Sequence, residues 1–189
     1  MKKLICMLLA LMMVLTMAVS FASCGEGEDG KENTENEEGK TENEEKEEEV
    51  TVPDGYTMYE NGGIRFAHPE DWEKSTDDMI MDKNGNTINV VTEDKTDLYD
   101  DLTKEEYEET YVPIYESMGM TVTNVSLEHT ETNGLKVLKV AYTMSVQGVS
   151  MKQTQYITTV GEKTYTVTVC LITDVNGLVE NVFNTLSKA

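Results

Sequence analysis

The sequence predicts an α+β domain in which an antiparallel β-sheet is packed with helices. Three long segments, residues 135–146, 149–160 and 164–172, alternate apolar and polar side chains in the manner of half-buried strands. Two other segments, residues 104–118 and 175–187, repeat apolar residues at helical spacing. The order along the chain is strands, helix, strands, helix, which is typical of an α+β fold with helices packed on an antiparallel sheet.

Short strands are expected at the start of the domain. Ile64 and Phe66 fall on one side of residues 63–68, and Asn84-Gly85 is a hairpin turn joining residues 79–82 to 87–92. The same turn has a second interpretation, because Asp82 and Glu93 occupy the first and last ligand positions of an EF-hand loop. Thr87 stands where that loop needs glycine, so the hairpin is the preferred interpretation.

The long strands follow one another through short turns. Gln147-Gly148 and Gly161-Glu162-Lys163 connect the three alternating segments, which predicts an antiparallel meander. Asn133-Gly134 is a further hairpin turn that brings residues 121–130 in ahead of them.

Each predicted helix has recognisable end signals. Thr103 and Glu106 fit a capping box, Gly119 is placed to end the first helix, and Pro113 inside it should produce a kink. The second helix is expected over residues 175–187, with Asp174 as a possible N-cap.

The first residues resemble an export signal with a lipidation site. Two lysines precede residues 4–22, which carry no charge, and Phe21-Ala22-Ser23-Cys24 resembles the lipobox of bacterial lipoproteins, with Phe21 standing where leucine is usual. The resemblance implies a signal peptide over residues 1–23, cleavage after Ser23, and acylation of the Cys24 thiol with fatty chains such as palmitate. The expected location is the extracytoplasmic face of a cell membrane. An uncleaved anchor over residues 4–22, or ordinary cleavage with release, are the alternatives.

An acidic tether is predicted between the lipidated cysteine and the domain, over residues 24–54. Residues 25–50 contain 13 acidic residues and three lysines, with Val50 as their one apolar residue. A segment of this composition cannot offset the entropy lost on folding, so it should be disordered and act as a spacer. Loose binding of divalent cations by its carboxylates is the alternative.

The net charge restricts the partners. The chain has 36 Asp+Glu against 15 Lys+Arg, giving −21 at pH 7. Such a polyanion repels phosphate backbones, so we expect no nucleic-acid partner. The expected partners are the lipid bilayer, through acylated Cys24, and an envelope protein.

The start of the domain carries a family resemblance. Ile64-Arg65-Phe66, His68-Pro69 and Trp72, together with the order of elements, resemble the PsbP/Mog/DcrB-like fold over residues 55–189. The resemblance implies an α/β/α sandwich around an antiparallel sheet and a binding or assembly module. That family shares no common active site, so no catalytic residue is carried over to this chain.

The side chains suited to catalysis have structural explanations. His68 should end a strand, His129 should lie in a surface pair with a neighbouring glutamate, and Cys170 should behave as a small apolar residue of a strand. We therefore expect no catalytic residue, no metal and no cofactor, and the chain is not expected to be an enzyme.

The candidate binding residues are aromatic. Tyr107, Tyr111 and Tyr115 form a stripe at helical spacing, and Trp72 follows the family signature. The stripe can be part of the core or part of a ligand or partner face. The sequence thus predicts a membrane-anchored, non-catalytic binding or assembly module, with a small-solute receptor lipoprotein as the alternative and an envelope hydrolase as a weaker third hypothesis.

Overall fold

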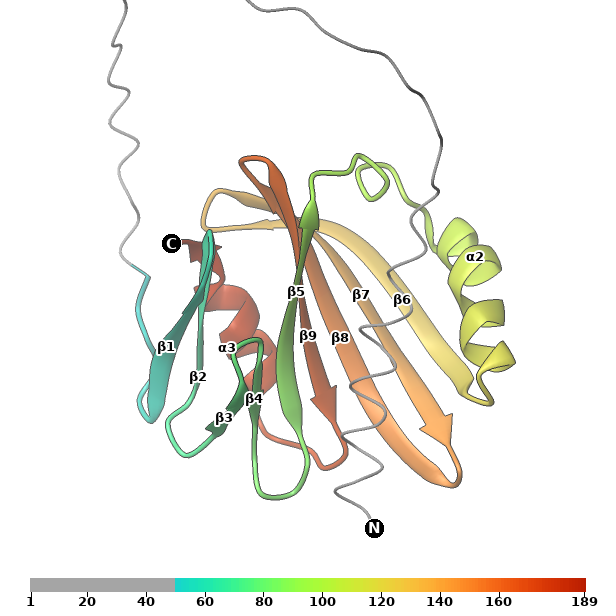
Figure 1. Cartoon of the computed structure of the whole chain (residues 1–189), viewed down its shortest axis with the longest axis horizontal. Helices are drawn as coiled ribbons and strands as arrows, with labels where there is room; N and C mark the ends of the chain where they lie inside the picture. Colours follow the sequence, from blue (N-terminus) through green and yellow to red (C-terminus); the bar gives the residue numbers. More distant parts are fainter. Residues whose placement is uncertain (1–49) are drawn as a thin grey trace, which may run out of the picture. The chain divides into compact units, whose positions relative to one another are not determined.

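Two antiparallel sheets and two helices make up residues 50–189, the part of the chain that the computed structural model describes (Figure 1). The elements are β1 (Tyr56–Asn61), β2 (Ile64–Pro69), β3 (Glu73–Thr76), β4 (Met79–Met81), β5 (Thr87–Asp94), α2 (Lys104–Ser117), β6 (Thr121–Thr132), β7 (Leu135–Val146), β8 (Val149–Val160), β9 (Lys163–Leu171), α3 (Leu178–Thr185) and β10 (Ser187–Lys188). The predicted signal peptide, Ser23, Cys24 and the tether up to residue 49 lie outside the described residues.

The larger sheet has the order β3-β4-β5-β9-β8-β7-β6, and the smaller has the order β1-β2-β10. The predicted meander of residues 121–172 is confirmed as β6 to β9, with antiparallel pairing throughout. Asn133 and Gln147 have φ angles of 45° and 49°, and the glycine after each is also positive, as the tight turns of hairpins require.

The predicted hairpin of residues 79–92 is also confirmed. Asp82 Oδ1 accepts hydrogen bonds from the backbone N–H groups of Asn84 and Asn86, at 2.7 and 2.9 Å, which closes the turn between β4 and β5. Glu93 lies at the far end of β5 from this turn, so it cannot complete an EF-hand loop there.

The capping box of α2 forms as predicted. The Thr103 hydroxyl accepts from the Glu106 backbone N–H at 3.2 Å, and Glu106 Oε2 accepts from the Thr103 backbone N–H at 2.9 Å. Pro113 lies inside the helix, and Gly119, with φ of 77°, follows its end.

The prediction for the second helix was too long at both ends. The helix α3 covers Leu178–Thr185, its N-cap is Gly177 with φ of 72°, and Asp174 does not cap it. Asp174 instead pairs with Lys152 at 2.8 Å. Ser187 leaves the helix because β10 pairs with β2, where the Arg65 Nε group donates to the Ser187 hydroxyl at 3.1 Å.

The two helices cover opposite faces of the larger sheet. Tyr142 of β7 contacts α2, whereas Lys139 of the same strand lies over the Phe183 ring of α3. Residues three apart on a strand point to opposite sides, so α2 and α3 lie on different faces.

The main core lies on the α3 side, between the larger sheet, α3 and the smaller sheet (Figure 1). It includes Ile64, Phe66, Tyr156, Val167, Leu178 and Leu186, all fully buried. Tyr165 joins the two sheets, because its hydroxyl accepts from the Gly63 backbone N–H at 3.0 Å. The expected α+β fold class is confirmed. Among the described residues, no helix combines the length and the apolar character that a bilayer span needs.

Candidate functional site

Five tyrosines gather on the α2 side of the larger sheet, and we call them the tyrosine cluster: Tyr99, Tyr107, Tyr111, Tyr115 and Tyr142. The capping box fixes where α2 begins, and helical spacing then brings its three tyrosines to one side. The Tyr107 and Tyr111 ring centroids are 4.8 Å apart. Tyr142 lies beneath the helix, with its ring centroid 6.3 Å from that of Tyr107 and 5.8 Å from that of Tyr115.

A line of hydrogen bonds connects the helix to the sheet. The Tyr142 hydroxyl donates to Gln153 Oε1 at 2.7 Å. The Tyr115 and Tyr142 hydroxyls are 3.3 Å apart. Since Tyr142 has already donated its proton, Tyr115 is the donor in this pair. Burial, followed by the nearby Tyr115 hydroxyl, raises the pKa of Tyr142 well above its usual range. The hydroxyls here are therefore neutral donors and acceptors.

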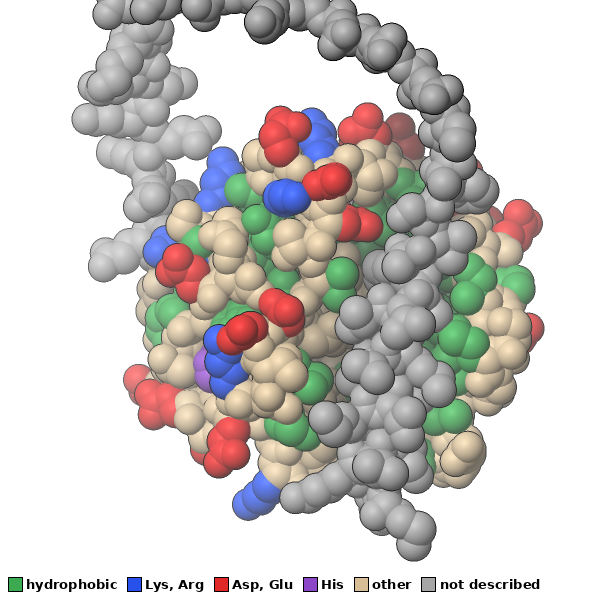
Figure 2. Space-filling model, viewed as in Figure 1, with side chains coloured by type: hydrophobic (Ala, Val, Ile, Leu, Met, Phe, Trp, Pro, Cys, Tyr) green, Lys and Arg blue, Asp and Glu red, His purple; other side chains and the backbone are tan. Residues whose placement is uncertain are grey.

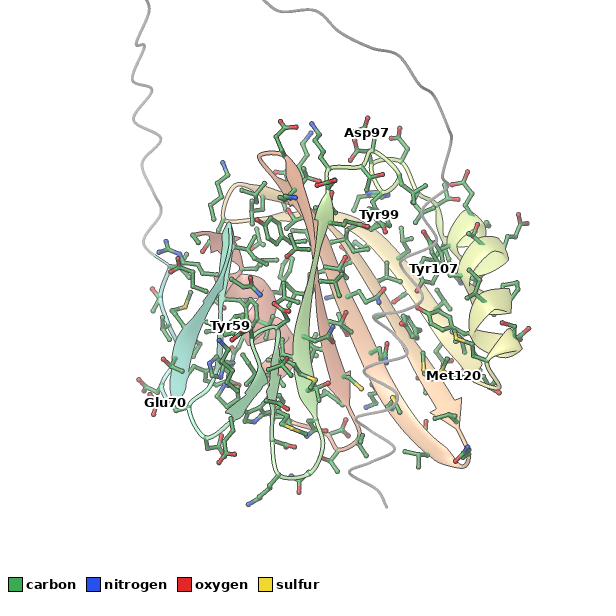
Figure 3. All side chains as sticks on the ribbon, viewed as in Figure 1. Tyr59, Glu70, Asp97, Tyr99, Tyr107 and Met120 are labelled. Atoms are coloured by element: carbon green, nitrogen blue, oxygen red, sulfur yellow. The ribbon has the colours of Figure 1, made fainter. Side chains whose placement is uncertain are left out.

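A carboxylate, that of Glu93, lies at the end of the tyrosine cluster formed by Tyr99 and Tyr111. Glu93, at the end of β5, lies beside the Tyr99 hydroxyl, and Tyr99 also interacts with Tyr111. Burial raises the pKa of the Glu93 carboxyl, and the interaction with Tyr99 lowers it in part. Burial also raises the pKa of Tyr99, with a further increase from the Glu93 carboxylate. Figure 3 shows Tyr99 and Tyr107 on the same side of the sheet.

Two buried polar atoms of this region have no hydrogen-bond partner among the described residues. They are Glu93 Oε1 and the Tyr107 hydroxyl oxygen. The Tyr107 hydroxyl lies near those of Tyr115 and Tyr142, and the Glu93 side chain interacts with Tyr99, but neither of the two atoms has a hydrogen bond of good geometry. Leaving a buried polar group unpaired costs about 1–3 kcal/mol, and folded proteins contain few such groups. Tyr107 is only 3% exposed, and burial raises the pKa of its hydroxyl far above the usual range. These two atoms therefore have hydrogen-bonding capacity that the described part of the chain does not use.

A cleft of about 1150 Å³ opens next to the cluster, between residues 95–103 and the ends of β6, β7 and β8. Tyr99 lines it, and Leu138 and Ile157 contribute apolar side chains from the sheet. Glu93 does not line this cleft, and two threonines lie between them. Thr159 lines the cleft and bonds to Thr164 at 3.2 Å, and Thr164 is the cross-strand neighbour of Glu93.

Charged side chains of both signs surround this cleft. Asp97, Asp100, Asp101 and Glu131 line it, together with Lys95, Lys136 and Lys188. Figure 2 shows carboxylates gathered, with lysines among them, at the end of the domain where Figure 3 places Asp97.

The structure brings together three of the four aromatic residues that the sequence suggested. Tyr107, Tyr111 and Tyr115 are in the cluster, with Tyr107 and Tyr115 buried. Trp72 belongs instead to the main core on the α3 side, where it is 7% exposed. It therefore lies apart from the tyrosine cluster.

Both histidines have backbone partners. His68 Nδ1 donates to the carbonyl oxygen of Pro69, and His129 Nε2 donates to that of Leu102, each at 2.9 Å. The bond from His129 holds the 95–103 segment against β6, in place of the surface pair with a glutamate that we expected. Cys170 is buried on β9, with its Sγ 3.5 Å from Met151 Sδ. Among the residues that the structure describes, no group of His, Cys, Asp and Glu side chains is arranged to hold a metal ion.

Three members of the site were not found from the sequence: Glu93, Tyr99 and Tyr142. Tyr142 could have been placed from its strand pattern, since it shares a face with Leu138 and Val140. Glu93 and Tyr99 carried no comparable signal, because their proximity depends on how β5 and the following loop lie under α2.

Comparison with known proteins supports the fold. No family model matches the sequence, and no curated protein matches it. The domain is similar to the solution structure of cyanobacterial PsbP (CyanoP) from Synechocystis sp. PCC 6803, with 14% identity, a TM-score of 0.53, and coverage of 71% of this chain and 93% of that chain. The described domain therefore has a PsbP-like fold.

Two further solved structures are more distant. One is from Bacteroides thetaiotaomicron VPI-5482, with 13% identity, a TM-score of 0.38, and coverage of 73% of this chain and 43% of that chain. The other, a protein of unknown function from Pseudomonas aeruginosa, has 11% identity, a TM-score of 0.33, and coverage of 61% of this chain and 82% of that chain. TM-scores this low add nothing to the fold assignment.

Proposed function

We propose that this chain is a lipid-anchored extracytoplasmic protein whose domain is a non-catalytic binding or assembly module. The anchor is supported by Ala22-Ser23-Cys24 directly after the uncharged residues 4–22. Acyl chains contribute about 0.8 kcal/mol per buried CH₂, so two chains on Cys24 would hold the protein at the bilayer. The acidic residues that follow would separate the domain from the membrane surface.

The observation that carries the binding role is the pair of unpartnered atoms, Glu93 Oε1 and the Tyr107 hydroxyl. Both lie in a cluster of aromatic rings beside a cleft. Sites for small molecules combine apolar and aromatic walls with a few polar groups, and the cleft is lined by Tyr99, Leu138 and Ile157. A ligand that supplies the missing hydrogen bonds removes the cost of leaving these atoms unpaired.

The scatter of the exposed apolar side chains favours the small-solute receptor over a purely protein-binding module. Among the described residues, the exposed large apolar side chains are Val52, Leu98 and Ile114, which lie in three separate segments. Single exposed apolar residues are ordinary, whereas a protein-docking surface usually presents a contiguous patch. An envelope protein would then contact the receptor at a surface other than the tyrosine cluster.

The anchor is tested by feeding an alkyne-bearing palmitate analogue to bacteria that express the full chain. We expect the wild-type chain to be labelled and to fractionate with membranes, and the Cys24→Ala variant to lose both properties. A Cys6→Ala variant is the matched control and should be labelled normally. Membrane fractionation of an unlabelled wild-type chain would contradict the anchor.

The binding role is tested on the purified full chain with ¹³C-labelled tyrosine rings. We expect the low-molecular-mass fraction of a bacterial envelope extract to shift the NMR signals of Tyr99, Tyr107 and Tyr111. The signals of Tyr156 and Tyr165, which lie in the main core, are the internal control and should stay unchanged. If no fraction of the extract shifts the NMR signals of the tyrosine cluster, the proposed binding role is contradicted.

A further inference from the structure

The Glu93 carboxylate lacks a cationic partner within the described part of the chain. The salt bridges there are Lys74–Asp77, Lys104–Glu108, Lys152–Asp174 and Lys163–Asp94. The neighbouring residue Asp94 has its cation at 2.7 Å, whereas Glu93 Oε1 is buried without any partner. The Glu93 side chain is half-buried and already interacts with Tyr99, which leaves Oε1 as its open acceptor. A cation with N–H donors would satisfy both this oxygen and the carboxylate charge.

The surroundings of Glu93 suit an ammonium group. Tyrosine rings attract cations through their electron-rich faces, and the Tyr107 and Tyr111 rings are packed together beside Tyr99. The phenol oxygens accept hydrogen bonds from N–H donors, as does Glu93 Oε1. A group with several N–H donors and a positive charge fits both features, and Leu138 and Ile157 in the cleft offer surface for an attached hydrocarbon chain.

The charge of the domain favours the same class of ligand. Residues 51–189 hold 23 acidic and ten basic residues, a net charge of −13. Fields of this sign raise the local concentration of cations and repel anions. A neutral polyol would satisfy hydrogen bonds but not the carboxylate charge. Calcium takes six to eight oxygen ligands, usually from several carboxylates, and this cluster has one.

We propose that Glu93 and the tyrosine cluster bind the ammonium group of an aliphatic amine. This inference rests on the binding role proposed above and names its ligand class. The Glu93 carboxylate would accept from the ammonium N–H groups, the tyrosine rings would contact the charge, and the alkyl chain would extend into the cleft beside Tyr99.

The test compares n-butylammonium with 1-butanol, which has the same chain and no charge, on the purified full chain with ¹³C-labelled tyrosine rings. We expect butylammonium to shift the Tyr99 and Tyr111 signals saturably, and 1-butanol and potassium chloride at equal ionic strength to leave them unshifted. Glu93→Gln, which keeps the shape and removes the charge, should weaken butylammonium binding roughly tenfold or more. Asp94→Asn makes the same charge change on the next residue and should bind as the wild type does.

Each contrary result overturns the inference. Equal shifts with 1-butanol or potassium ions would exclude recognition of the ammonium group. An unchanged titration in Glu93→Gln, or equal weakening in Asp94→Asn, would exclude Glu93 as its partner. If butylammonium fails while the envelope extract still shifts the cluster, the ligand class is wrong and the binding role stands. If neither shifts it, the binding role fails as well.

Discussion

Glu93 combines a cost in stability with a proposed role in binding. Its pKa is raised by burial above the ordinary value of 4.5, so ionisation opposes folding. The favourable contribution of the protonated form is complete below the unfolded pKa and is lost as the pH rises through the higher folded pKa. At neutral pH the ionised carboxylate therefore lowers the free energy of unfolding.

Glu93→Gln should consequently stabilise the domain at neutral pH. Solvent screens a half-buried carboxylate, so we expect a gain of a few tenths to about 1 kcal/mol. The difference between variant and wild type should shrink as the pH falls below the ordinary carboxyl value. Urea unfolding at a series of pH values measures both effects. Asp94→Asn should show the opposite sign, because pairing with Lys163 lowers the pKa of Asp94.

The same substitution should have different effects at two neighbouring tyrosines. Tyr107→Phe keeps the ring contacts and removes a buried hydroxyl that has no hydrogen bond of good geometry, so we expect the free energy of unfolding to stay unchanged or to rise by up to about 1 kcal/mol. Tyr142→Phe removes the donor to Gln153 Oε1 and should lower it by about 1–3 kcal/mol. Urea unfolding of both variants gives the comparison. Equal losses would show that the Tyr107 hydroxyl has a partner after all.

The site could be predicted in part, for reasons visible at single residues. Tyr107, Tyr111 and Tyr115 were found because one period, that of the helix, places them together. Trp72 was grouped with them on residue type alone, and the structure places it in the main core. Glu93 and Tyr99 come close to the tyrosines of α2 through tertiary contacts, and such contacts produce no periodic pattern in the sequence.

At the scale of elements, two hairpin turns of similar backbone shape differ in their side-chain contacts. Asn133 and Gln147 both have a positive φ and precede glycine. Asn133 Nδ2 also donates to the carbonyl oxygens of Asn184 and Leu186, each at 2.9 Å, and so ties the β6–β7 turn to the end of α3. Gln147 makes no side-chain hydrogen bond within the described residues.

Replacing each residue with glycine should separate these two contributions. Gln147→Gly relieves a left-handed backbone at a residue type that disfavours it, so stability should be unchanged or rise by a few tenths of a kcal/mol. Asn133→Gly gives less relief, because asparagine tolerates this backbone conformation, and it also loses the hydrogen bonds to Asn184, Leu186 and Thr132, for a net loss of about 1–3 kcal/mol. Thermal or urea unfolding measures both. If Gln147→Gly lowers the free energy of unfolding as much as Asn133→Gly does, the hydrogen bonds from Asn133 to the end of α3 do not explain the loss.

The elements that the sequence predicted well are those with local signals. The bounds of β7 and β8 agree with their alternation, and Thr103 and Glu106 form the expected capping box. The pairing of β5 with β9, which joins Ile88 to Val169, links distant parts of the chain and was not predicted. The end of α3 was misplaced because Ser187 pairs with β2 instead of continuing the helix.

At the scale of the whole domain, the residues that stabilise the fold and the residues proposed to bind a ligand lie on opposite faces of the larger sheet. The α3 face holds the main core, which includes Phe66, Tyr156 and Leu178. The α2 face holds polar atoms without partners, which a well-packed core would not tolerate. Because the main core does not need the α2 face to be complete, the unsatisfied site can exist without unfolding the domain.

The location of the main core predicts that residues 50–189 fold without the preceding chain. Among the described residues, this segment builds the main core cluster and forms its own compact unit, Val50–Ala189. Residues 50–189 and residues 24–189 should therefore show the same urea midpoint and the same m-value. The matched control ends at residue 185: it lacks β10 and the fully buried Leu186, and should lose about 3 kcal/mol or more. A lower midpoint for residues 50–189 than for residues 24–189 would mean that the preceding segment contributes to the folded domain.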